Sequence, residues 1–365
     1  MTLILLVGML AIDATHFTET GVYQPLRLSE ALVSEDGSLY VLAFPEATIR
    51  FYGPDGTLRK TIGGKGEGPG EFIYPDQMWV QDRQLYVFDV NNGQISLFDE
   101  KGKFVKRWSA PNRGLELIKV RSGWVYGTWQ NFGEAVEKNE LVWADETFET
   151  VTTLCTVADV GNDQGFSVTN NGTESIGVYN PIRTRPRIVP STDGTRIYLT
   201  DVHDLKIQVI DLDQKKIVQT IQHKVKRIPF DEDWAEAKFK ENTEGRHSAS
   251  TKWTKIYPEQ FPAIRSLTLA PDGNLIVDRW RGKPDDTNWF LTLTPKGEVV
   301  KKEWNGERLK RQVGVHGEFA YVTYWDTEAE EAAVARVPRG KVDAWIAAHP
   351  VEYDGPTGRT MSFDH

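Results

Sequence analysis

Cysteine is nearly absent from this chain of 365 residues, with Cys155 as the single example. A disulfide framework within one chain is therefore excluded, and so is a zinc site built from cysteine thiolates. A lone cysteine with no neighbouring base motif is usually a small buried side chain. We therefore expect Cys155 to be structural and not a nucleophile.

Excess positive charge is also absent, because 43 Lys and Arg residues face 52 Asp and Glu residues, for a net charge of -9. This balance argues against a uniformly basic surface for nucleic acid and leaves room only for a local basic patch. Beyond the N-terminus, no apolar stretch has the length of a membrane-spanning helix. We expect no nucleic-acid partner and no integral membrane segment.

The N-terminus holds the one extended apolar run, Leu3 to Ile12. Its length suits the core of a signal peptide and is too short to span a bilayer. No Lys or Arg precedes it, and Ile12 spoils the small-x-small pattern that ends at Ala14. We expect an atypical export signal in residues 1–16 and a periplasmic or extracellular protein. The alternative is a strand or helix packed against the domain.

What the chain contains in abundance is a repeated four-strand phrase. The first two copies are "EALVSEDGSLYVLAFPEATIRFYGPDGTLRKTI" and "DQMWVQDRQLYVFDVNNGQISLFDEKGKFVKRW". Apolar residues alternate within them, as at Leu39 and Val41, which is typical of half-buried strands. Gly37 and Gly56 lie where antiparallel strands reverse and accept the positive φ of such turns.

Four further copies follow, with sequences that differ more from the first two. Each copy has an apolar or aromatic residue at the same position of its second strand. Three of the five intervals between these positions equal one unit, and two are longer by roughly thirty residues, so we expect insertions at about 155–186 and 222–260. Neither insertion is expected to contain another strand–glycine–strand phrase, although the second should hold a short helix near Trp234. The six positions are Tyr40, Tyr86, Tyr126, Tyr198, Ile276 and Tyr321.

Four-stranded antiparallel units of about 40–45 residues are typical of β-propeller blades. The chain is therefore predicted to be all-β, a single six-bladed β-propeller of four-stranded blades over residues 17–340. A short amphipathic helix in residues 341–365 is expected to dock on its outer edge. Residues Tyr23 to Leu28 are expected to supply the strand that closes the last blade and removes an exposed edge.

The stretch "TIGGKGEGPGEF", Thr61 to Phe72, is dense in glycine. A phosphate-binding loop leads from a strand into a helix whose N-terminus meets the anion. Here Pro69 interrupts the glycines, Pro75 follows, and a strand comes next. We therefore interpret the stretch as the crossing from the first blade to the second, and not as a nucleotide site.

The segment "GGKGEGPGEFIYPDQMWVQDRQLYVFDVNNGQISLFDEKGKFV" resembles an NHL repeat. The segment "YPEQFPAIRSLTLAPDGNLIV" resembles a group of bacterial exported six-bladed propellers. The resemblance covers most of residues 25–340 and is strongest in the second repeat. It implies the fold and says little about activity, because propellers host many unrelated functions.

Enzymatic six-bladed propellers provide a test of catalysis. The gluconolactonase-like group holds a divalent metal on the axis with a carboxylate and Asn side chains, and the peptide-amidating lyase group uses His ligands. The equivalent positions here lack Asn, and the seven histidines fall at unrelated places in their repeats. We expect no catalytic residue, no metal site and no cofactor, with calcium as the disfavoured alternative.

The residues expected at the start of each inner strand change from negative to positive charge along the chain. Acids occupy these positions in the first three repeats and arginines in the last three, so an anion-attracting half could face an acidic half. Arginine offers a planar fork suited to carboxylate or phosphate. The alternative is that these charges pair across the channel and close it. The candidates are Glu30, Asp76, Glu116, Arg187, Arg265 and Arg311, with Arg279 nearby and Trp129 and Trp280 as flat apolar contacts.

Two further patterns have structural interpretations. Asp89, Asp201 and Asp278 follow second strands, and we expect them to bind backbone groups of the adjoining loops. Tryptophans at the same level, including Trp325, could simply pack between blades.

The sequence favours a non-catalytic binding propeller that recognises an anionic small molecule, a glycan or a peptide at its axial face. A metal-dependent hydrolase or lyase of the gluconolactonase type is the first alternative, and a structural or assembly protein is the second.

Overall fold

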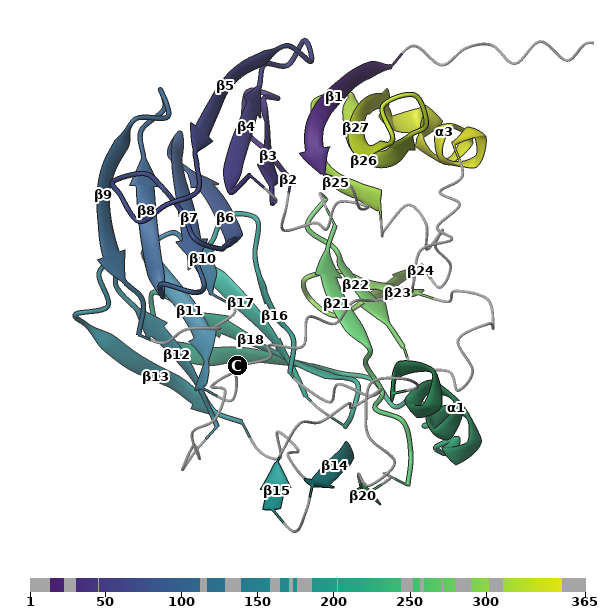
Figure 1. Cartoon of the computed structure of the whole chain (residues 1–365). Helices are drawn as coiled ribbons and strands as arrows, with labels where there is room; N and C mark the ends of the chain where they lie inside the picture. The colour runs from purple at the N-terminus through teal and green to yellow at the C-terminus, as the bar shows by residue number, and fades with distance from the viewer. Residues whose placement is uncertain are drawn as a thin grey trace, which may run out of the picture. The chain divides into compact units, whose positions relative to one another are not determined.

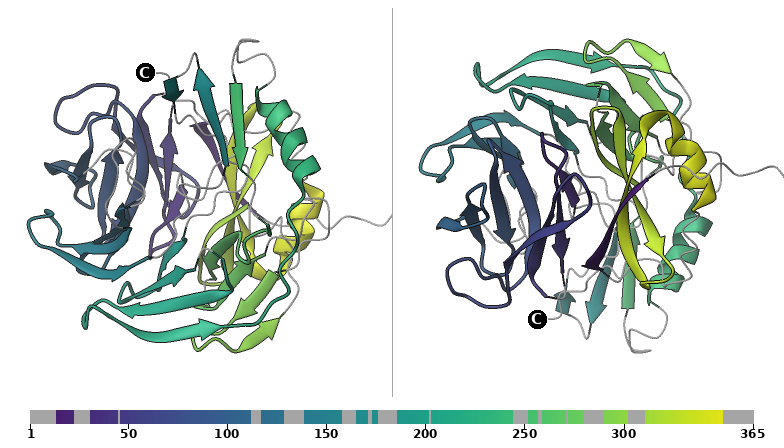
Figure 2. Two further views of the ribbon diagram at one scale, coloured as in Figure 1. Left: turned by 90° about the horizontal axis from the view of Figure 1, so that it is seen from below. Right: turned by 90° about the horizontal axis from the view of Figure 1, so that it is seen from above.

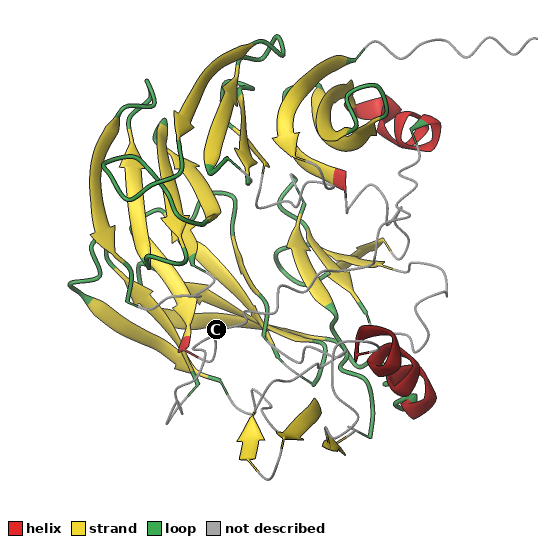
Figure 3. Ribbon diagram, in the orientation of Figure 1, coloured by secondary structure: helices red, strands yellow, loops and turns green. Residues whose placement is uncertain are grey.

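The fold consists almost entirely of antiparallel strands, as Figures 1 and 3 show. In the described part of the chain they form six four-stranded sheets and one three-stranded sheet. The chain is thus an all-β, six-bladed propeller of four-stranded blades, as predicted. The computed structural model describes residues 14–22, 31–44, 46–111, 117–128, 139–157, 165–170, 173–175, 186–201, 203–243, 252–256, 259–270, 272–279, 290–301 and 311–349.

Blades one, two and six belong to the first of two compact units, which comprises residues 1–107 and 305–365. Blade one consists of β2 (Ala31–Val33), β3 (Leu39–Ala43), β4 (Thr48–Tyr52) and β5 (Leu58–Gly63). Blade two consists of β6 (Pro75–Gln81), β7 (Gln84–Asp89), β8 (Gln94–Phe98) and β9 (Phe104–Ser109), which ends at the unit boundary. Blade six consists of β1 (Thr15–Val22), β25 (Gln312–His316), β26 (Phe319–Asp326) and β27 (Glu331–Pro338).

Blades three, four and five belong to the second unit, residues 108–304. Blade three consists of β10 (Ile118–Val120), β11 (Gly123–Gly127), β12 (Glu140–Ala144) and β13 (Val151–Thr156). Blade four consists of β16 (Ile188–Pro190), β17 (Arg196–Thr200), β18 (Lys206–Asp211) and β19 (Lys216–Gln222). Blade five consists of β21 (Ser266–Leu269), β22 (Leu275–Asp278), β23 (Phe290–Leu293) and β24 (Val299–Lys301).

Burial follows the position of each strand within its blade. All five residues of β3 are buried, whereas β5 at the edge of the same sheet exposes five of its six residues. Inner strands are covered on both faces, so they read as continuous apolar runs. The repeated second-strand residues confirm this, since all six are at most 7% exposed: Tyr40, Tyr86, Tyr126, Tyr198, Ile276 and Tyr321.

The last blade is closed by β1, which pairs with β27 so that Thr15 lies opposite Arg336 (Figure 2). Closure from the N-terminal side is confirmed, but the expected position, Tyr23 to Leu28, is wrong. The closing strand lies upstream, and residues 23–30 fall outside the described part of the chain. Phe17 explains why residues 15–22 form the closing strand. Its ring is fully buried and lies 5.9 Å from Tyr52 and 5.7 Å from Tyr321, measured between ring centroids.

The C-terminal segment forms a 3-10 helix, η3 (Arg339–Lys341), followed by helix α3 (Val342–Ala348). The helix predicted for the C-terminal segment is confirmed. Its buried residues Val342, Trp345 and Ile346 pack on one face of β26 and β27. The opposite face of that sheet, which includes Tyr321, packs with residues of blade one. Ala333 and Ala335 of β27 belong to the same apolar cluster.

The glycine-rich stretch between β5 and β6 contains turns, and β6 begins at Pro75 with no intervening helix. Its N–H groups are used inside the loop. Gly66 N donates to Phe72 O at 2.9 Å, and Gly68 N donates to the Glu71 carboxylate at 2.9 Å. These donors therefore do not point outward as a phosphate cradle requires.

Arg107 in β9 binds the same loop through its carbonyl groups. Its Nη2 donates to Gly68 O at 2.9 Å and to Glu71 O at 2.6 Å, and its Nη1 donates to Glu67 O at 3.1 Å. Its Nε is held by Ser96 Oγ at 3.0 Å. The loop thus presents oxygen atoms to a cation, the reverse of a phosphate loop. The interpretation as a crossing between blades is confirmed.

The second insertion contains the predicted helix, α1 (Glu232–Thr243). Asp231 caps it, because the Asp231 carboxylate accepts a hydrogen bond from Trp234 N at 2.9 Å. Ala235 is fully buried, and the Trp234 ring meets Phe261 edge-on at 5.7 Å. The helix is therefore anchored to the domain by its first turn.

The two insertions meet in the three-stranded sheet, in which β14 (Gly165–Asn170) lies between β15 (Thr173–Ser175) and β20 (Lys252–Ile256). The expectation that neither insertion holds a strand–glycine–strand phrase is wrong for the first one. There, Asn171 and Gly172 separate two strands in the sequence. The sheet draws on both insertions and has three strands, so the count of six blades stands.

Candidate ligand-binding site

Two candidate arginines flank one strand pair in blade five. Arg265 directly precedes β21 and Arg279 directly follows β22. Because Ser266 lies opposite Asp278 in the antiparallel register, both arginines emerge at the same end of the sheet. Arg265 N donates to Asp278 O at 2.8 Å and extends this register by one hydrogen bond.

Arg187 is brought to the same place by blade four, in which it directly precedes β16. Its backbone is fixed on both sides, since Arg187 N donates to Thr200 Oγ1 at 2.8 Å and Arg187 O accepts from Thr200 N at 3.0 Å. Its guanidinium Nη2 donates to Arg265 O at 3.4 Å. Inner strands of neighbouring blades therefore carry adjacent arginines, as the sequence predicts for these two positions.

Asp278 supplies a carboxylate to this set. Its Oδ2 lies 3.8 Å from Arg265 Nε, and the two side chains are 18% and 54% exposed. An ion pair at this distance and exposure is a weak contact, which a better placed anion can replace.

Arg279 lies deeper than Arg265. Its Nη2 donates to Lys226 O at 3.2 Å, in the segment that leaves β19, and its Nε has no hydrogen-bond acceptor among the described residues. Burial lowers the pKa of the Arg279 guanidinium, because desolvation disfavours its charged form. An anion nearby would offset this cost. We call Arg187, Arg265 and Arg279 the arginine group.

Arg311 belongs to the first compact unit, and its described contacts lie within that unit. Arg311 is 5% exposed in the first unit, and its Nε donates to Thr323 O at 2.9 Å. Its Nη1 donates to His349 O at 2.9 Å and to Ile346 O at 3.4 Å, the carbonyls at the end of α3. A cation at a helix C-terminus is stabilising. These contacts commit Arg311 to holding α3.

The other candidates have fewer described contacts. Asp76 lies in β6 of blade two, where its Oδ2 accepts from Gln77 Nε2 at 3.3 Å. Trp325 packs against the apolar cluster formed by blades one and six. The remaining candidates fall outside the described residues: Glu30, Glu116, Trp129 and Trp280.

The loop aspartates follow the expected pattern in two of three blades. The Asp89 carboxylate accepts from Ile73 N at 2.6 Å and Tyr74 N at 3.1 Å, and Asp201 accepts from His203 N at 2.8 Å. These contacts confirm their structural role. The Asp278 carboxylate also contacts the side chain of Arg265, at 3.8 Å.

Within the described ranges, no three His, Cys, Asp or Glu side chains gather closely enough to hold a metal ion. Cys155 is free, partly buried and packed against the core of blades three and four, and burial raises the pKa of its thiol to about 11. A thiol that is protonated at neutral pH is a poor nucleophile, in keeping with the structural role expected of it.

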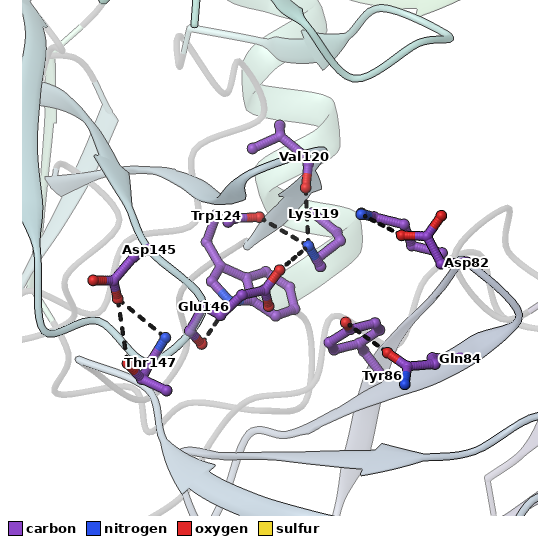
Figure 4. A network of polar contacts seen from close by, with 11 residues as sticks. Asp82, Gln84, Tyr86, Lys119, Val120, Trp124, Asp145, Glu146 and Thr147 are labelled. Carbon is purple, nitrogen blue, oxygen red and sulfur yellow. Dashed lines mark hydrogen bonds and ion pairs between the residues drawn. The ribbon is translucent and has the colours of Figure 1, made fainter. Parts of the chain in front are cut away.

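Sequence reasoning missed Lys119, whose side chain in β10 is only 3% exposed. Its ammonium lies 2.7 Å from the Glu146 carboxylate, donates to Val120 O at 2.9 Å, and lies 5.2 Å from the Trp124 ring centroid (Figure 4). The only signal is a lysine at an alternating apolar position of a strand. The contacts named above all lie within blade three, which favours a structural role for this ion pair.

Six four-stranded sheets define the class of this protein as a six-bladed β-propeller. A family model described as a 6-bladed beta-propeller (DUF5128) matches residues 32–159, which span blades one to three. No curated protein matches the sequence. No helix among the described residues is long and apolar enough to cross a membrane.

Solved structures of similar shape cover most of the chain at low identity. A putative exported protein from Bacteroides fragilis is 12% identical with a TM-score of 0.52, covering 89% of this chain and 94% of its own. A member of the DUF4221 family from Bacteroides vulgatus is 10% identical with a TM-score of 0.53, covering 89% and 95%. A gluconolactonase from Xanthomonas campestris reaches a TM-score of only 0.40 at 9% identity, covering 89% and 92%. The first two likenesses support the fold and do not extend to activity.

Proposed function

We propose that this propeller is a binding protein that recognises an anionic group of a small molecule, a glycan or a peptide through the arginine group. The observation that carries the proposal is that Arg265 and Arg279 emerge at the same end of blade five, where the Arg187 guanidinium of blade four contacts Arg265 O. Arginine forks at such a place bind planar anions bidentately.

The existing contacts of the group suit exchange with a ligand. The hydrogen bond to Arg265 O and the ion pair to Asp278 are both long, at 3.4 and 3.8 Å. The Arg265 side chain is more than half exposed and needs no core rearrangement to turn toward solvent. The cost of releasing these contacts is therefore small beside a charge-assisted bidentate pair, which is about twice as strong as a neutral one.

The test is a thermal-shift and calorimetric titration of the full chain with acetate, sulfate, inorganic phosphate and a short acidic peptide. An anion at about 100 times its Kd stabilises the folded state by about 2.7 kcal/mol. At about 2 °C per kcal/mol for a chain of this size, the melting temperature should rise by about 5 °C. Replacing Arg187 and Arg265 together by alanine should abolish the shift.

Arg59→Ala is the matched control, because Arg59 is half exposed and ion-paired with Asp55 on blade one. A second variant, Asp278→Asn, removes the internal carboxylate and should increase anion affinity severalfold, an effect that misfolding cannot imitate. Unchanged affinity in the double arginine variant, or no binding of any probe, contradicts the proposal. Stoichiometric calcium or zinc in the purified protein would favour the metal-dependent alternative instead.

We also propose that the protein is exported. The apolar run Leu3 to Ile12 supports this, and the similar Bacteroides fragilis structure is itself described as a putative exported protein. Because Thr15 and Phe17 are part of blade six, processing should occur upstream of Thr15. Mass measurement of the mature N-terminus tests this, and a cut beyond Val22 would contradict it because it would remove β1.

A further inference from the structure

The fourth strand of blade four, β19, lies at one edge of its sheet, in which the strand order is β16-β17-β18-β19. An edge strand offers a row of backbone N–H and C=O groups to any extended segment that comes alongside. β19 has seven residues and is longer than the fourth strands of blades one, two, three and five. It therefore offers a partner strand more backbone groups than these other edges do.

The sequence of β19 also lacks the usual protection of an edge. Natural edge strands are guarded by charged side chains, by proline or by short length. β24 has only three residues, and β5 and β9 each contain two basic residues, Arg59 and Lys60 or Lys106 and Arg107. β19 has no charged residue after Lys216, its first residue, and no proline.

Exposed apolar side chains lie on this edge. Ile217 is 38% exposed and Val218 is 41% exposed. Ile217 and Gln219 lie opposite consecutive residues of β18, so Val218 is an extra residue at a register shift. The extra residue at the corresponding shift in β5 is Arg59, which is paired with Asp55. Blade four thus places an apolar side chain where blade one places a charge.

The edge strand of blade three, β13, is also uncharged, but its surroundings differ. Glu149 precedes it by two positions, and the Glu140 carboxylate accepts from Thr153 Oγ1 at 3.2 Å. Thr152 Oγ1 lies 3.3 Å from the ammonium of Lys215, which belongs to blade four. Acidic groups therefore accompany β13, and they distinguish it from β19.

Basic residues flank the uncharged part of β19 on both sides, and no Asp or Glu occurs between Gln214 and Phe230. The turn of blade five that contacts β19 adds one charge of each sign, on Lys296 and Glu298. This local excess of positive charge contrasts with the net charge of -9 of the whole chain. The flanking residues are Lys215, Lys216, Lys224, Lys226 and Arg227, of which Lys216, Lys224 and Lys226 are exposed.

These features determine which partner suits the edge. Antiparallel pairing with a second copy of β19 would bring the two sets of lysines together, which is unfavourable. An extended peptide with an uncharged, β-branched core and acidic ends would pair with the backbone and place its acids beside the lysines. We propose that β19 binds such a segment of a partner protein by adding it to blade four as a fifth strand. β19 contains none of the side chains of the arginine group, so the two sites can be tested separately.

The test is fluorescence anisotropy of the full chain with a labelled nine-residue peptide, in which alternating valine and threonine residues are flanked by two aspartates at each end. A copy with methylated core nitrogens should bind about tenfold more weakly, because it loses several hydrogen-bond donors. Replacing Lys216 and Lys224 together by glutamine should weaken binding about fivefold. The matched control replaces Lys60 and Lys106, exposed lysines of β5 and β9, and should change the affinity by less than about twofold.

Hydrogen exchange locates the bound peptide. Backbone amides of residues 216–222 should exchange more slowly in the complex, and protection of another strand instead would overturn the proposal. Equal binding of the methylated copy would mean charge attraction alone and would also overturn it, as would no binding. A dimer in light scattering with β19 protected in the absence of peptide would assign the edge to a second copy. Loss of binding in the double alanine variant of Arg187 and Arg265 would place the peptide at the arginine group and contradict the proposal for β19.

Discussion

Replacing Phe17 by alanine should destabilise the propeller more than any surface substitution, because this ring attaches β1 to blade six. Phe17 is fully buried and lies against Tyr52 and Tyr321, with Leu39, Val41 and Val334 in the same cluster. Removing a buried phenyl ring costs about 3–5 kcal/mol, which combines the lost transfer free energy with the cavity left behind. At about 2 °C per kcal/mol, the melting temperature should fall by about 6–10 °C.

The assay is differential scanning calorimetry of the full chain, with limited proteolysis to locate the damage. The N-terminal segment should become cleavable near Val22 before the rest of the chain unfolds. Phe17→Leu, which keeps most of the apolar volume, should recover a large part of the loss. Val105→Ala, at a side chain that is half exposed on β9, is the control and should shift the melting temperature by less than about 1 °C. Equal shifts in Phe17→Ala and Val105→Ala would refute the reasoning.

Three further predictions concern the scaffold. Arg107→Ala should lower the free energy of unfolding by about 1–3 kcal/mol, because three loop carbonyls lose their hydrogen-bond donor. Arg107→Lys should not restore this stability, because one ammonium group cannot reach all three carbonyls as the guanidinium does. Urea denaturation measures the stability of both variants. Arg311→Ala should cost about 2–4 kcal/mol and expose α3 to protease, whereas protection equal to wild type would contradict its role in holding that helix. Desolvation opposes the ionisation of Asp145, but hydrogen bonds from the Thr150 side chain and from backbone N–H groups together hold its pKa below the ordinary value. The resulting stability is present above the unfolded pKa of about 3.9 and is lost as pH falls through the folded pKa. The gap in melting temperature between wild type and Asp145→Asn should therefore narrow from pH 7 to pH 3, and a constant gap would contradict the assignment.

The blades were predictable because the same sequence pattern occurs in every repeat. Alternating apolar residues, turn glycines and a buried second-strand residue recur six times, so errors in one copy are corrected by the others. Tyr126 and Tyr198 were therefore correctly predicted as buried second-strand residues, although their repeats match the pattern less closely. Non-repeated features had no such support, and the closing strand was misplaced. Its assignment depends on Phe17 meeting residues far along the chain.

The candidate site was predictable only in part. The position before each inner strand correctly placed Arg187 beside Arg265, since strand starts in adjacent blades share a level. The same rule cannot anticipate that the Arg311 guanidinium donates to two carbonyl groups at the end of α3. Nor can it anticipate that the Arg279 guanidinium donates to the backbone carbonyl of Lys226 in the second insertion. Contacts made by insertions and tails depend on tertiary packing, which repeat spacing does not encode.

The pairing of Thr15 with Arg336 has a consequence for biosynthesis. Ribosomes add about 5–20 residues per second, so β1 emerges on the order of 15–60 s before its partner β27 exists. During this interval a strand with open backbone groups and the apolar Phe17 side chain is exposed to other nascent chains. Crowded expression should therefore favour dimers that exchange their first strands, and slower initiation or a cooler culture should favour the sealed monomeric ring.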